Sequence, residues 1–130
     1  MPKLGIGNGQ LMQCPDTPNC VNSQAADEKH FIQPIQFVGT SLEAQKRLLE
    51  ILNEWDHAKV IITNRNYIRA EFVSKVFRFV DDVEFYFPET EDKEITIHVR
   101  SASRIGYSDL GVNQKRIELV RSKLKQNSHQ

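Results

Sequence analysis

The chain has 130 residues, of which 39% are hydrophobic and 26% are charged, and this composition is ordinary for one soluble globular domain. Its 17 basic side chains balance 17 acidic ones, which argues against a protein that binds nucleic acid over its whole surface. Any site that binds anions must therefore be local.

The first 13 residues carry three glycines and little periodicity, which predicts a flexible arm (1–13) ahead of a single globular domain over residues 14–125. This arm lacks the apolar core of a cleavable signal. The longest aliphatic run is Val60-Ile61-Ile62, far short of the roughly 20 residues of a membrane-spanning helix. We therefore expect a cytoplasmic protein without a membrane span.

Two cysteines, Cys14 and Cys20, enclose a loop that Pro15 and Pro18 make stiff. A disulfide between them would close a short ring and contribute about 2 kcal/mol on the loop-entropy model. The alternatives are two reduced thiols, which the missing leader favours because the cytosol is reducing, or a metal or redox site. A metal would need two further ligands, and no second CxxC or HxxxH pair is present. We predict no metal and no cofactor.

A strand and a helix are predicted next. Apolar residues over 30–37 favour a strand, which Pro34 confines to a sheet edge. Thr40 is the expected N-cap of a helix over 42–55, and Glu43 completes a capping box. The apolar residues of this helix have helical spacing and predict one face packed on a sheet. They are Ala44, Leu48, Ile51, Leu52 and Trp55.

Four further strands follow, beginning with Val60–Thr63, and their short connections make them antiparallel neighbours. Asp81-Asp82 is expected to form a hairpin turn. Alternation separates two faces. The inward set is Ile68, Ala70, Phe72, Val83, Phe85, Phe87, Ile95, Ile97 and Val99. The outward set is Tyr67, Arg69, Glu71, Glu84, Tyr86, Thr96, His98 and Arg100, most simply a solvated surface, with a binding role as the alternative.

The segment from Arg100 to Arg116 leads from the last strand to a last helix, for which Asn113 is the expected N-cap. Ile117, Val120 and Leu124 would form the apolar face of this helix. The pattern as a whole predicts an α+β fold, with a four- to five-stranded antiparallel sheet and two helices packed on one face.

Three motifs, in this order, resemble the bacterial and plastid family called domain of unknown function 1499. They are CPDTPNCVNS at 14–23, DDVEF at 81–85 and VRSASRIGYSDLGVNQKR at 99–116. The resemblance spans about Leu11 to Leu124. It implies no established activity, and some relatives carry leaders or membrane anchors.

The same 100–116 segment is the candidate binding site. Arginines ahead of a helix N-terminus can bind a carboxylate or phosphate, because the helix end adds unpaired N–H groups and partial positive charge. A purely structural clamp, with Asp109 paired to Arg104 or Arg116, is the alternative. The expected ligand-binding residues are Arg100, Ser101, Ser103, Arg104, Asp109, Asn113 and Arg116.

Three functions are compatible with this pattern. The leading hypothesis is a non-enzymatic module that binds an anionic small molecule or an acidic partner segment. The second is a hydrolytic or thiol-dependent enzyme that uses His98 with Ser103, or with Cys14 or Cys20, although no specific catalytic signature is present. The third is an accessory or assembly protein that acts through a partner surface. No nucleic-acid partner is expected.

Overall fold

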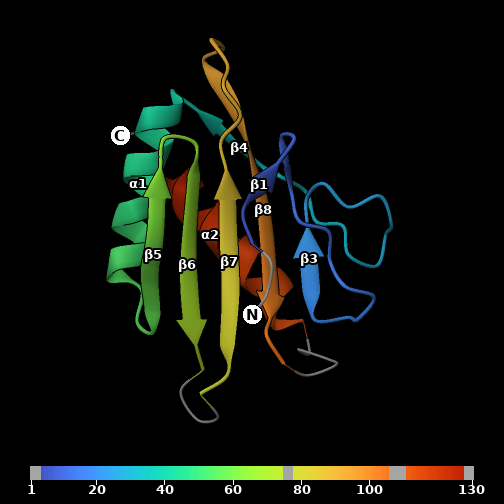
Figure 1. The fold of residues 1–130 in the computed structure, drawn as a ribbon. Coiled ribbons are helices and arrows are strands. Elements are labelled where there is room, and N and C mark those ends of the chain that lie inside the picture. The colour runs from blue at the N-terminus through green and yellow to red at the C-terminus, as the bar shows by residue number, and fades with distance from the viewer. Residues whose placement is uncertain (1–3, 75–77, 106–110, 128–130) are drawn as a thin grey trace.

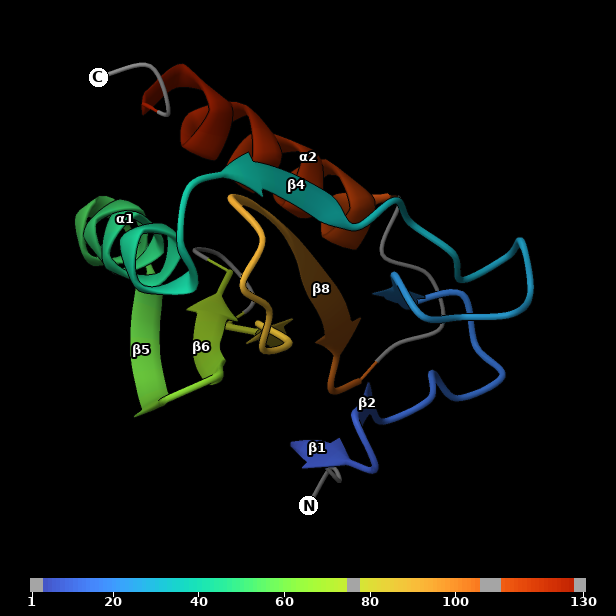
Figure 2. The same ribbon diagram turned by 90° about the horizontal axis from the view of Figure 1, so that it is seen from above.

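The computed structural model describes residues 4–74, 78–105 and 111–127, which form an α+β fold with one main sheet (Figure 1). Viewed from above, two helices lie on one side of this sheet and a short hairpin lies on the other (Figure 2). Within the described ranges, no helix has the length and apolar character needed to cross a membrane.

The main sheet has six antiparallel strands, more than the four or five predicted. The order is β3-β8-β7-β6-β5, and β4 pairs with the first half of β8 while β3 pairs with its second half. The two short strands therefore share one edge of β8; β4 corresponds to the edge strand predicted over 30–37, and β3 is the strand that the sequence did not predict. The strands are β3 (Cys20–Asn22), β4 (Ile35–Val38), β5 (Ala58–Asn64), β6 (Tyr67–Val73), β7 (Val80–Tyr86) and β8 (Glu94–Ser103).

Both helices pack on the same face, as predicted. Helix α1 (Ser41–Glu54) begins after Thr40, whose side chain accepts from the Glu43 amide while the Glu43 side chain accepts from the Thr40 amide, which confirms the capping box. Helix α2 (Val112–Asn127) buries Ile117, Val120 and Leu124 against the sheet. The inward residues predicted for the strands join these side chains in one core, which confirms the alternation of the two faces.

Asp81 and Asp82 do not form a turn; they lie inside β7 and are buried. Short polar side chains favour turns in general, but each of these carboxylates is bound by an arginine, and that pairing stabilises the strand. The β6–β7 connection lies further back in the chain, where the Ser74 amide donates to the Phe79 carbonyl.

The N-terminal segment contains a hairpin of β1 (Ile6–Gly7) and β2 (Gln10–Leu11). Its two-residue turn, Asn8-Gly9, has positive φ at both positions, the geometry that matches the twist of a hairpin and that this dipeptide favours. The hairpin lies across β7 and β8 on the face opposite the helices (Figures 1 and 2). Leu11 is buried, and the Gly5 amide donates to Glu84 of β7 at 2.8 Å.

Cys14 and Cys20 are joined in a disulfide with a Cα–Cα distance of 5.7 Å. The bond ties the segment that follows the hairpin to the first residue of β3. Of the three alternatives for this pair, the structure therefore has the disulfide.

Candidate functional site

The sheet separates the residues that the sequence places in one binding site. Successive residues of a strand point to opposite faces, so Arg100 lies on the face away from the helices while Ser101 and Ser103 lie on the helix side. Asn113 and Arg116 join the helix side from α2, and Arg104 turns back to the opposite face. Asp109 lies outside the described residues.

On the helix side, these side chains form a closed clamp around Asn113. Its amide nitrogen donates to the Asn19 carbonyl and to Ser103 Oγ, and its oxygen accepts from Ser101 Oγ and from Arg116. Asn113 lies inside the first turn of α2, so it is not the N-cap that the sequence predicts. Its side chain is buried and binds β8. Hydrogen bonds of this kind fix the start of α2 on the sheet.

Arg116 is neutralised inside the protein. Its Nη1 lies 2.9 Å from Asp81 Oδ2, and its guanidinium stacks over the Phe72 ring at 4.6 Å. Both members of the ion pair are nearly buried, with side chains 12% and 11% exposed. Arg116 is therefore a structural clamp with little charge to offer a ligand.

Arg104 is also neutralised, on the other face. Its Nε and Nη2 donate to the two oxygens of Asp82, each at 2.9 Å, and Nη2 also contacts Glu71 at 2.7 Å. The hydrogen bond to Asp82 is the main reason that the pKa of Arg104 is raised above its ordinary value. Arg100, Arg104 and Arg116, which the sequence places in one binding site, are thus each paired with a carboxylate of the protein and do not share one pocket.

The pairs proposed for catalysis are not formed either. His98 and Ser103 are five residues apart in one strand, and an odd separation places them on opposite faces. The cysteines share a disulfide, so neither offers a thiol. His98 Nδ1 instead lies 3.0 Å from Ser23 Oγ.

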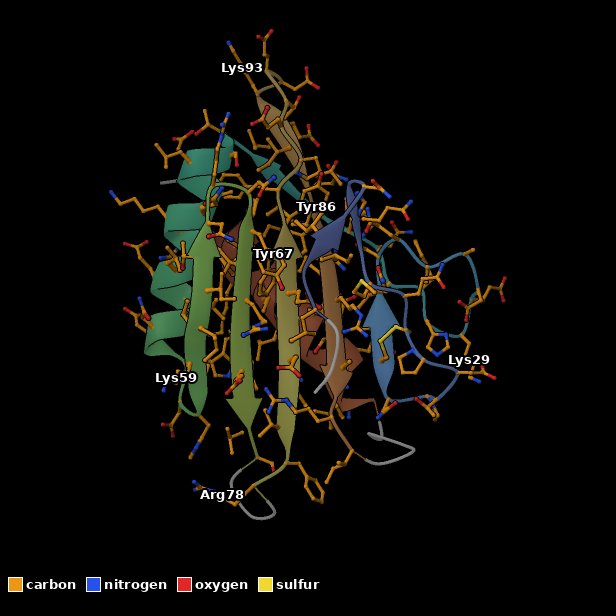
Figure 3. All side chains as sticks on the ribbon, in the orientation of Figure 1. Lys29, Lys59, Tyr67, Arg78, Tyr86 and Lys93 are labelled. Atoms are coloured by element: carbon orange, nitrogen blue, oxygen red, sulfur yellow. A yellow bond between two sulfur atoms is a disulfide. The ribbon has the colours of Figure 1, made fainter. Side chains whose placement is uncertain are left out.

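The polar face carries three rows of side chains that run across the strands, one residue from each strand opposite the next. The first row is Tyr67, Tyr86 and His98. The second, here called the central row, is Arg69, Glu84 and Arg100. The third is Lys59, Glu71, Asp82 and Ala102. Tyr67 and Tyr86 mark the first row in Figure 3.

Glu84 lies at the centre of the central row and is fully buried, with 0% exposure. Its carboxylate accepts from the Tyr67 hydroxyl at 2.5 Å, from the Gly5 amide at 2.8 Å and from Arg100 Nη1 at 3.3 Å. Burial is the largest cause of a raised pKa at Tyr67, followed by the hydrogen bond to Glu84, so Tyr67 stays protonated as a donor. A buried carboxylate is tolerated here because three donors satisfy it.

The two arginines of the central row are incompletely satisfied. Arg100 uses its Nη atoms on Glu84 and on the Gln13 carbonyl, yet its Nε is buried without a hydrogen-bond partner. Arg69 Nε is buried without a partner as well, and no carboxylate among the described residues lies within 4.0 Å of the Arg69 guanidinium. Buried polar groups are normally paired, so these two N–H groups are donors that lack an acceptor within the described part of the protein.

His98 borders the central row in a neutral form. Ser23 Oγ accepts from the Val99 amide at 2.8 Å and forms a second hydrogen bond, 3.0 Å long, with His98 Nδ1. The ring stacks on Tyr86 with centroids 6.4 Å apart. Burial lowers the pKa of His98, in agreement with a neutral ring.

The alternation of the strands predicts all six residues of the first two rows as an outward face, but it does not predict Lys59 or Ala102, and it treats the face as solvated. What it misses is that the hairpin of β1 and β2 covers this face, because the first 13 residues are expected to be a flexible arm. The signal that could have revealed the cover is Asn8-Gly9, which is the strongest short hairpin signal a sequence offers. A hairpin in contact with the sheet turns an outward face into a half-buried site.

A family model described as "Protein of unknown function (DUF1499)" matches residues 10–124. This range includes the whole central row and the clamp around Asn113, and it agrees with the resemblance carried by the three motifs. No curated protein matches the chain.

Proposed function

Since the chain belongs to the DUF1499 family, whose description assigns no activity, we propose its role from the polar face: it binds a small anionic molecule at the central row. The ligand carries a carboxylate or phosphate group, which accepts from the guanidinium groups of Arg69 and Arg100. This retains the class of function expected from the sequence and moves the site from the 100–116 connection to the sheet.

One observation carries the proposal, namely the two buried Nε–H groups without partners on either side of Glu84. A neutral clamp would leave no such donors, as the arrangement around Asn113 illustrates. An anion that contacts Arg69 and Arg100 would supply the missing acceptors. Arg69 is only half-buried, which gives the ligand a route from solvent.

The charge of the row also favours an anion. Arg69 and Arg100 carry two positive charges, against one negative charge on Glu84. In the neighbouring row Lys59 faces Glu71, and Glu71 already binds Arg104. The Glu84 oxygens are occupied by Tyr67, Gly5 and Arg100, so they do not compete for the remaining donors. A half-buried site of low dielectric strengthens each of these contacts relative to water.

A titration with defined anions tests the proposal. We would follow the melting temperature and the heat of binding with inorganic phosphate, a nucleoside monophosphate and citrate. A ligand present at 100 times its dissociation constant stabilises the folded state by about 2.7 kcal/mol, which is easily detected. Arg69→Gln should abolish binding without unfolding the protein, because Arg69 forms no ion pair with any residue that the structure describes.

The matched control is Arg65→Gln, in the turn before β6. Arg65 is an exposed arginine whose guanidinium pairs with exposed Glu89, so its loss removes the same charge away from the row. Equal weakening in the two variants would show that net charge alone attracts the anion. No stabilisation by any of the three anions would contradict the proposal.

A further inference from the structure

The disulfide joins the segment that covers the polar face to the sheet itself. Here the segment of residues 4–13, which contains the hairpin, is called the N-terminal cover. Cys14 follows this segment directly, and Cys20 is the first residue of β3, the edge strand of the sheet. The bond lies beside β3 (Figure 3) and is therefore a covalent cross-link between the end of the cover and the edge of the sheet.

The two cysteines differ in their access to solvent. Cys20 is 1% exposed, whereas Cys14 is half-buried and lines a hollow of about 500 Å³. Of the described residues that line this hollow, only Asp27 is charged, and its carboxylate lies 2.6 Å from His30 Nδ1. A thiolate breaks a disulfide by attacking a sulfur that it can reach, so Cys14 is the point of attack.

The body of the protein holds the cover mainly by its backbone. The Gln24 side chain accepts from the Leu11 amide at 2.8 Å and donates to the Gly9 carbonyl at 3.3 Å. Asn22 donates to the Met12 carbonyl at 2.9 Å, and Leu11 adds a buried apolar side chain. Each such hydrogen bond contributes little net free energy, because water competes for the same groups. A covalent link at the end of the cover therefore matters for keeping it closed.

Two further contacts join the cover to the central row. The Gly5 amide donates to Glu84 at 2.8 Å, and the Gln13 carbonyl accepts from Arg100 Nη2 at 3.4 Å. Gln13 is the residue before Cys14, so the disulfide fixes the carbonyl that Arg100 contacts. A change at Cys14 therefore reaches the central row through the adjacent residue.

We propose that Cys14 Sγ is a site of thiol–disulfide exchange and that reduction by a dithiol loosens the N-terminal cover over the central row. One thiolate of the dithiol forms a bond with Cys14 Sγ, the bond to Cys20 breaks, and Cys20 leaves as a thiolate that takes up a proton. The second thiolate of the dithiol then attacks the sulfur bound to Cys14 and releases Cys14 as a thiol. The dithiol ends as a cyclic disulfide, and the protein gains two electrons and two protons.

Reduction should also weaken the anion site, a consequence that rests on the proposed function. Once the cover is loose, the row lies closer to water, where each contact with an anion is weaker. Glu84 loses the Gly5 amide and then competes with the anion for the Arg100 guanidinium. The oxidised protein should therefore bind phosphate more tightly than the reduced protein, by roughly tenfold.

Mass spectrometry locates the point of attack. The oxidised full chain is exposed briefly to glutathione and then to N-ethylmaleimide, which alkylates the thiol that the exchange releases. We expect glutathione on Cys14 and the maleimide on Cys20. The reverse assignment, or equal labelling of the two cysteines by glutathione, would contradict the proposal.

Hydrogen exchange measures the cover without any anion. After reduction with dithiothreitol, exchange at the Gly5 and Leu11 amides should accelerate by roughly tenfold more than at the Phe85 amide of β7. Phe85 is fully buried in the sheet, so the comparison separates a local opening from global unfolding. A Cys14→Ser, Cys20→Ser double variant is the control, which should match the reduced protein and be unaffected by dithiothreitol.

The outcomes separate the two proposals. Equal acceleration at the three amides, or none, would overturn the loosening of the cover. Phosphate titration of both redox states tests the effect on the anion site, and equal affinities would overturn that effect. If phosphate binds neither form while the cover still loosens, the proposed anion site fails and the exchange at Cys14 stands.

Discussion

Asp81 and Asp82 are neighbours in β7, yet they bind arginines on opposite faces of the sheet. Asp81 contacts Arg116 of α2 on the helix side, and Asp82 contacts Arg104 on the polar side. One dipeptide therefore fastens the segment that leaves β8 and the helix that follows it. Strand residues alternate between faces, so their place in β7 puts the two carboxylates on opposite sides of the sheet.

The two carboxylates should differ in their contribution to stability. Asp81→Asn leaves the nearly buried Arg116 without a counter-charge and should lower the free energy of unfolding by about 2–3 kcal/mol. Asp82→Asn should cost about 1 kcal/mol, because Arg104 is 34% exposed and keeps Glu71. Urea denaturation of each variant measures these values, and equal losses would contradict the assignment.

Tyr67 and Tyr86 form a matched pair on the polar face. Tyr67→Phe removes a donor from the buried carboxylate of Glu84 and should destabilise the protein by about 1–3 kcal/mol. Tyr86→Phe should change stability by less than about 0.5 kcal/mol, because no hydrogen bond of its hydroxyl is found among the described residues. Thermal and urea unfolding would contradict this if Tyr86→Phe were the more damaging change.

His98 should make stability depend on pH. Burial holds its pKa in the folded protein below the ordinary 6.5, so the unfolded chain binds a proton first. The stability that neutral His98 contributes is complete above about pH 6.5 and is lost as the pH falls from there to the folded pKa. Ring-proton NMR measures that pKa, and His98→Gln should flatten the unfolding free energy across the same window. A folded pKa at or above 6.5 would contradict the prediction.

The disulfide should stabilise the loop that follows the hairpin. Reduction of Cys14–Cys20 opens a ring closed across six positions of the chain and should cost about 2 kcal/mol. The measurement is unfolding with and without reductant, together with thiol titration, which should find no reactive thiol before reduction. A Cys14→Ser, Cys20→Ser double variant is the control, because reductant should leave its stability unchanged.

Local sequence patterns predict most of this fold. The capping box at Thr40 and the alternation in β6, β7 and β8 depend on neighbours in sequence, and the structure confirms them. The prediction of a turn at Asp81-Asp82 is wrong because distant arginines bind these carboxylates. Arg104 lies 22 positions after Asp82, and Arg116 lies 35 positions after Asp81. Long-range pairing of this kind leaves no local pattern.

The candidate site shows the same limit. Arg100 and Arg116 are close in sequence, and only the parity of β8 reveals that a sheet lies between them. Arg69 is 31 positions from Arg100, and strand pairing through β7 brings them into one row. Residue types alone therefore indicate an arginine-rich segment at 100–116, while register decides which arginines can share a ligand.

The central claim is that Arg69 and Arg100 hold an anion through their Nε–H groups, and NMR of arginine side chains tests it directly. The Nε–H signals are assigned with Arg69→Gln and Arg65→Gln and then followed as inorganic phosphate is added. We predict saturable shifts at Arg69 and Arg100 and none at Arg65. Unchanged signals in the central row, or equal shifts at Arg65, would contradict the account.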